Sequence, residues 1–208
     1  MGSYSTDRGF ADIYLPQQAA ILQPVLAAYF PPIPHISSWQ RDVFNAADFT
    51  VYRHDNVDIG ARVRRPRYAS IFGLMEFTLR SHRATGTPTE FEKIKNGNGQ
   101  WFSYFHSDDD GRLPHWLIVD LEGVRLNLNI NPGSFRDNRD GTGFRVFDVR
   151  RFPVGIMIAA SETVTAALPF PYQTAMRRRQ MRQWEPYRGA RAAAGVGPEW
   201  LFPTGQNA

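Results

Sequence analysis

The chain has 208 residues, 42% hydrophobic and 13% aromatic, enough to bury a sizeable core in one domain. Its formal charge of +4 favours an anionic partner, and the absence of cysteine excludes disulfides, thiolate metal sites and thiol nucleophiles. No apolar run approaches the roughly 20 residues that span a bilayer, and the N-terminus lacks a signal-peptide pattern. We therefore expect a cytoplasmic protein with no membrane contact.

Composition divides the chain into three parts. Residues 1–10 are polar, and we expect them to be disordered. Residues 11–170 have the apolar patterning of a single α/β domain. Residues 171–208 are rich in arginine, proline and glycine, which indicates a basic C-terminal extension.

The first predicted element is a helix over residues 11–29. Apolar residues recur there near helical spacing, and Pro16 occupies a plausible first-turn position, although Pro24 interrupts the pattern. Residues 31–38 (PPIPHISS) follow as a rigid extended connector.

Residues 45–65 (NAADFTVYRHDNVDIGARVRR) alternate between apolar and polar residues on either side of a turn, which predicts a β-hairpin. Residues 74–83 repeat the alternation and predict a third strand. If the three strands pair in chain order as a meander, one polar face carries Asp48, Arg62, Arg64, Glu76 and Arg80.

A helix is predicted to begin after Thr89, because Glu92 stands three residues on, the spacing of a capping box. The glycines of residues 96–99 should end it. The aromatic run at residues 101–105 reads as core, and the apolar run at residues 115–121 as a central strand covered on both faces. We expect residues 131–143 to form a loop, followed by short strands within residues 144–152 and 155–161.

The order helix, hairpin, third strand, helix, apolar strand over residues 11–121 resembles the PD-(D/E)xK nuclease superfamily, which includes Holliday-junction resolvases and restriction-type endonucleases. The resemblance implies an α/β fold with a mixed central sheet flanked by helices. The stretches ADIYLPQ, EFTLRSHR and FDVRRFP also look like uncharacterised bacteriophage proteins, which would place the chain in the host cytoplasm.

In that superfamily an Asp opens the second strand of the hairpin unit, and a Glu-x-Lys lies on the next strand. Asp48 matches the Asp, whereas Arg62 and Arg64 stand at the positions of Glu and Lys. The resemblance therefore implies a migrated carboxylate at Glu76 and a migrated lysine at Lys93 or Lys95, of which Lys93 is the candidate. Catalysis would then use Asp48, Glu76 and Lys93, with Mg²⁺ held by Asp48 and Glu76, because hard cations prefer oxygen ligands.

A second reading needs no catalysis, because the same hairpin can be a solvated sheet face or a phosphate-binding face. Its arginines, together with the basic segment near residue 180, combine charge with an aromatic ring for base stacking. The residues expected to bind nucleic acid are Arg62, Arg64, Arg80, Arg177, Arg178, Arg179, Arg182 and Trp184. The expected partner is nucleic acid, DNA in preference to RNA, or a host nucleic-acid-processing protein.

Overall fold

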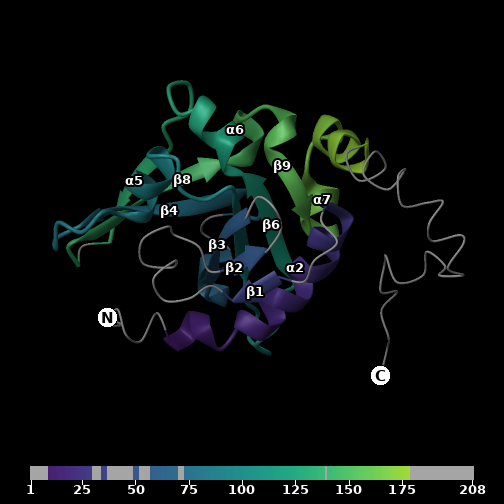
Figure 1. Ribbon diagram of the computed structural model, residues 1–208, viewed down its shortest axis with the longest axis horizontal. Helices are drawn as coiled ribbons and strands as arrows, with labels where there is room; N and C mark the ends of the chain where they lie inside the picture. Colours follow the sequence, from purple (N-terminus) through teal and green to yellow (C-terminus); the bar gives the residue numbers. More distant parts are fainter. Residues whose placement is uncertain are drawn as a thin grey trace, which may run out of the picture.

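The computed structural model describes residues 9–29, 34–36, 49–51, 57–69, 73–138 and 140–178 (Figure 1). Its helices are α2 (Leu15–Tyr29), α5 (Glu90–Lys95), α6 (Leu121–Leu126) and α7 (Glu162–Ala167), with residues 170–178 also helical. Its strands are β1 (Pro34–Ile36), β2 (Phe49–Val51), β3 (Val57–Arg64), β4 (Glu76–Arg83), β5 (Trp101–His106), β6 (His115–Asp120), β7 (Ser134–Asp137), β8 (Thr142–Asp148) and β9 (Met157–Ala160).

The larger sheet, sheet A, has the strand order β1-β2-β3-β5-β6-β9. The pair β3 and β5 is parallel, with α5 in the connection between them, and the other neighbours are antiparallel. The predicted hairpin is confirmed, since Phe49 pairs with Ile59 and Thr50 with Asp58. The protein is therefore mixed α/β, with a mixed sheet and flanking helices.

The predicted meander is wrong, because β4 does not pair with β3. Instead β4 forms a second antiparallel sheet, sheet B, in the order β4-β8-β7. The place beside β3 belongs to β5, all six residues of which are buried. A strand with no solvated side chain needs a neighbour on each edge and a layer on each face, whereas β4 ends in the more exposed residues His82 and Arg83.

Two further expectations are corrected by the structure. Residues 134–137, expected in a loop, form β7, all of whose residues are exposed. Such a strand has no apolar alternation for sequence reasoning to detect. Residue 121 belongs to α6, because the Asp120 side chain accepts the Glu122 backbone N–H at 3.0 Å and so starts a helix.

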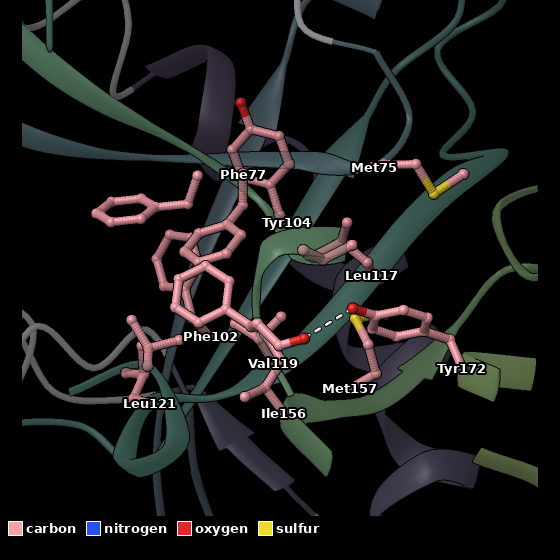
Figure 2. Packing of buried hydrophobic residues seen from close by; sticks show 14 of the residues in the cluster. Met75, Phe77, Phe102, Tyr104, Leu117, Val119, Leu121, Ile156, Met157 and Tyr172 are labelled. Carbon is pink, nitrogen blue, oxygen red and sulfur yellow. Dashed lines mark hydrogen bonds between the residues drawn. The ribbon is translucent and has the colours of Figure 1, made fainter. Parts of the chain in front are cut away.

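Two hydrophobic clusters hold the layers together. The first contains Phe77 of β4, Phe102 of β5 and Leu117 of β6, and joins sheet A to sheet B (Figure 2). The second lies between sheet A and α2, which Figure 1 shows in purple along one side of that sheet. Ile118 belongs to the second cluster, so β6 buries side chains on both faces and the prediction of a central strand is confirmed.

The helix at residues 170–178 packs on the first cluster. Its Tyr172 and Met176 are 7% and 3% exposed, and the Tyr172 hydroxyl donates to the Phe152 carbonyl at 2.7 Å (Figure 2). The packed part of the chain therefore reaches Met176. None of the helices in the described ranges is both long and apolar enough to cross a membrane.

The capping box that starts α5 is confirmed. Glu92 donates its backbone N–H to the Thr89 hydroxyl at 3.2 Å, and its carboxylate accepts the Thr89 N–H at 2.7 Å. The pKa of Glu92 is lowered from its ordinary value, because the Thr89 backbone N–H and the Thr89 hydroxyl, which donates to Oε2 at 2.9 Å, both favour the charged carboxylate. The helix ends at Lys95 with Asn96 as its C-cap, and Gly97 then takes a positive φ of 97°.

Candidate functional site

The structure describes only some of the predicted site residues. Asp48, Arg179, Arg182 and Trp184 lie outside the described ranges. Arg177 and Arg178 are exposed near the end of the last described helix, and Lys93 lies in the last turn of α5. The rest of the predicted site is on β3 and β4.

Arg62 on β3 is half-buried in an ion pair. Its Nη2 donates to Oε2 of Glu90, the first residue of α5, at 2.6 Å, and each side chain is 17% exposed. The same oxygen accepts the backbone N–H of Arg80 on β4 at 2.9 Å. One carboxylate therefore connects β3, β4 and α5.

Arg64 is enclosed by polar and aromatic groups between the sheets. Its Nε donates to the Tyr104 hydroxyl at 2.9 Å, and its Nη2 donates to the Thr78 hydroxyl. The guanidinium also lies over the rings of Tyr68 and Phe144, 5.5 and 5.2 Å from their centroids. Cation–π contacts of this kind stabilise a desolvated arginine.

These contacts show that Arg62 and Arg64 do not form the polar sheet face that was predicted. Arg62 and Arg64 do lie against β4, but through side-chain contacts between the layers and not through strand pairing. Both guanidinium groups have partners within the protein. Their position favours a structural role in joining the two sheets.

Glu76, the predicted metal ligand, opens β4 directly opposite Asp148, the last residue of β8. Opposed residues of an antiparallel pair share one face, with Cβ atoms about 4.5–5.5 Å apart. The pKa of Glu76 is raised from its ordinary value, first because the carboxyl is half-buried and second because Asp148 is negative. Arg150 and two other arginines oppose this shift without cancelling it.

Asp148 is held by Arg150. Its Oδ1 accepts the Arg150 backbone N–H at 2.9 Å and the Nε at 2.8 Å, and its Oδ2 accepts the Nη2 at 2.8 Å. Burial by itself would raise the pKa of Asp148, but these hydrogen bonds outweigh burial and lower it. The two facing carboxyls are therefore pushed in opposite directions, a pattern that separates an acid from a base in many active sites.

The donor set at this pair suits a hard divalent cation that keeps most of its water. Mg²⁺ commonly binds through one or two carboxylates and several waters. In the described ranges, no three His, Asp or Glu side chains gather closely enough to hold a metal ion, so the protein ligands there would be Glu76 and Asp148 alone.

Sequence reasoning missed Asp148. The alternation over residues 144–148 places it at the end of a strand, but its register opposite Glu76 depends on a pairing between segments about 70 residues apart. The sequence near Asp148 indicates only a local role, because Asp148 caps the turn that contains Arg150. That local spacing does not predict that Asp148 lies opposite Glu76.

A further carboxylate lies at the start of β3. Asp58 is opposite Thr50 of β2, its backbone N–H donates to Oε1 of Gln100 at 2.7 Å, and its carbonyl accepts the Gln100 N–H at 2.9 Å. Asp58 was not among the predicted site residues. In the structure Asp58 is the acidic residue of β3, the strand that pairs with β2.

Comparison with known proteins adds no identification. No protein-family model matches the chain, and no curated protein matches it either.

Proposed function

We propose that the protein acts on nucleic acid as a Mg²⁺-dependent phosphodiesterase with a restriction-endonuclease and resolvase-like core. The observation that carries the proposal is the facing pair Glu76 and Asp148, half-buried and bordered by Arg150. A pair of close carboxylates favours a bound cation, and the adjacent guanidinium suits a phosphate.

The arrangement of sheet A supports the nuclease-like part of the proposal. The helix α2, the hairpin β2–β3, the strand β4, the helix α5 and the apolar strand β6 occur in the order on which the resemblance was based, with β4 in sheet B and β5 inserted beside β3 in sheet A. Since β3 is the strand next to β2, the family's Glu-x-Lys strand corresponds to β3. Asp58 then becomes a second candidate carboxylate, in place of the positions of Arg62 and Arg64.

In this proposal each side chain has a separate task. Glu76 and Asp148 hold the cation, and the neighbouring Arg150 and Arg151 balance the charge of a phosphodiester. Burial and the facing Asp148 raise the pKa of Glu76, and a cation bound between the two carboxyls would favour the charged form of both. Lys93 remains the proposed basic group. A bound Mg²⁺ would supply charge stabilisation and a more acidic water.

The test is cleavage of labelled single-stranded DNA, duplex DNA and RNA with Mg²⁺ and with Mn²⁺. We expect Glu76→Gln and Asp148→Asn each to lower the cleavage rate by at least about 100-fold while leaving substrate binding. Glu122→Gln is the matched control, because Glu122 is 63% exposed and pairs with Arg125 on a different element, α6. Equal rates for wild type and Glu76→Gln would remove the enzymatic assignment.

The alternative function is binding of nucleic acid or of a host protein without catalysis. It is favoured by the way Arg150 engages both oxygens of Asp148, which leaves that carboxylate less able to bind a cation. Under this alternative no variant changes a cleavage rate, and Asp148→Asn alters only stability. Asp48→Asn and Asp58→Asn belong in the same assay, because loss of cleavage in these two alone would move the cation to the hairpin.

A further inference from the structure

A hollow of about 440 Å³ opens at the end of sheet B remote from Glu76. It is lined by His82 of β4, by Phe135 and Asp137 of β7, and by Gly141 of the turn before β8. The register explains this grouping, because His82 and Asp137 both pair with Gly143 and so lie on one face of the sheet. Sites for small ligands commonly have volumes of about 300–1,000 Å³.

Phe135 is exposed but held in position. Its side chain is 53% exposed, yet its ring lies against Gly143, where an added Cβ would be 2.6 Å from Cζ of the ring. Glycine at 143 therefore leaves the space in which the ring contacts the backbone of β8. The ring is held against the sheet there, and a large part of the residue stays open to solvent.

We propose that this hollow binds one unpaired nucleobase of a single-stranded nucleic acid, an inference that rests on the proposed action on nucleic acid. A base can stack on the open part of Phe135, since every base has an aromatic face. The Asp137 carboxylate can accept a hydrogen bond from an exocyclic amino group, and the His82 imidazole can reach another polar atom of the base edge. A base within a duplex has both faces covered and does not enter.

The charge around the hollow fits the phosphates on either side of such a base. Arg145 of β8 shares the face of the hollow, because it pairs with Phe135. Arg80 and Arg83 of β4 lie on the other face of the same end of sheet B, and Arg80 is near enough to Asp140 to contribute to the lowering of its pKa. The acidic residues at this end are Asp137 and Asp140. Arginine excess near an exposed aromatic ring is the combination that single-strand binding uses, with the cations following the backbone and the ring holding a base. An uncharged aromatic ligand would gain nothing from these arginines.

The hollow is separate from the proposed reaction site. His82 lies six residues beyond Glu76 on β4, about 20 Å at the rise of a strand, and on the opposite face. The bound base would therefore belong to a nucleotide distant from the one that is cleaved. It contributes to affinity and to the choice of single strands, and not to the chemical step.

The test compares two labelled 12-nucleotide strands, one with bases and one abasic, by fluorescence anisotropy at low salt. We expect Phe135→Ala to weaken binding of the strand with bases by about 5- to 100-fold and to leave binding of the abasic strand unchanged. Phe135→Tyr keeps the ring and should bind as wild type does. Phe170→Ala is the matched control, since Phe170 is 75% exposed on a different element.

A second measurement uses the wild-type protein, so that folding of a variant is not in question. A strand containing 5-iodouracil, irradiated in the complex, should crosslink to the peptide that contains Phe135. Equal affinity of wild type and Phe135→Ala for both strands, with the crosslink elsewhere, would overturn the base site and leave the proposed function standing. Binding of neither strand would overturn both.

Discussion

Arg62 and Glu90 form an ion pair that joins β3 to the first turn of α5, with 2.6 Å between Nη2 and Oε2. Because Glu90 also accepts the Arg80 N–H, loss of its charge affects two sheets and a helix. We expect Glu90→Gln to lower the free energy of unfolding by about 1.5–3 kcal/mol, since hydrogen bonds to charged, partly buried groups are stronger than neutral ones. Urea denaturation measures this.

The control for that experiment is Glu122→Gln. Glu122 pairs with Arg125 at 2.8 Å but is 63% exposed, so the change should cost only a few tenths of a kcal/mol. Similar losses for the two variants would show that the Arg62 ion pair does not fasten the sheets.

The lowered pKa of His106 leads to a predicted dependence of the free energy of unfolding on pH. It is 3% exposed, and burial, then Arg64, then His115 lower its pKa to about 4 from 6.5. The folded state keeps the imidazole neutral, so its contribution is complete above pH 6.5 and is lost as the pH falls from 6.5 towards 4. The loss should reach about 3 kcal/mol, because one pKa unit corresponds to about 1.4 kcal/mol.

NMR titration of the His106 ring protons tests this directly. The ring should remain neutral at pH 5, and His106→Leu should flatten the fall in stability between pH 6.5 and pH 4. A titration midpoint near 6.5 for His106 in the folded protein would contradict the burial seen in the structure.

Alanine substitutions at two glycines with positive φ, Gly97 and Gly133, allow the cost of backbone strain to be measured separately from the cost of steric overlap. An added Cβ at Gly133, where φ is +72°, would lie 2.8 Å from Cε1 of the buried Phe147, whereas Gly97 has φ +97° and no atom within 4 Å. Gly97→Ala should cost about 1–2 kcal/mol from strain alone. Gly133→Ala should cost about 1–3 kcal/mol more, because the ring has no space to move into.

Thermal and urea unfolding of both variants give this comparison. If Gly133→Ala were no less stable than Gly97→Ala, Phe147 would not be packed against the turn before β7.

Substitutions in the helix at residues 170–178 test where the folded domain ends. Met176 is buried in the first cluster and the adjacent Arg177 is exposed. Met176→Ala should lower the unfolding free energy by about 2–5 kcal/mol, and Arg177→Ala should change it by less than about 0.5 kcal/mol. Equal, small effects would place the domain boundary before residue 171, as the composition suggested.

Local patterns in the sequence were sufficient for the elements whose cause is local. The capping box at Thr89 and Glu92 starts α5, and the alternation on both sides of residues 52–56 gives the pairing of β2 with β3. The continuous apolar run of β6 identified a strand buried on both faces. In each case a few neighbouring residues carry the information, because caps and strand periodicity act over one to three turns or pleats.

Only the tertiary structure decided which strands are neighbours. The alternation of β4 is compatible with pairing to β3 or to β8. In the structure β5 takes the edge of β3, and β4 pairs with β8 and buries Phe77 in the first cluster. For the same reason Glu76 was predicted as a site residue while its facing carboxylate, Asp148, was not. A candidate site made across two strands depends on long-range register, and register is set by the packing of the whole core and not by the residues near the site.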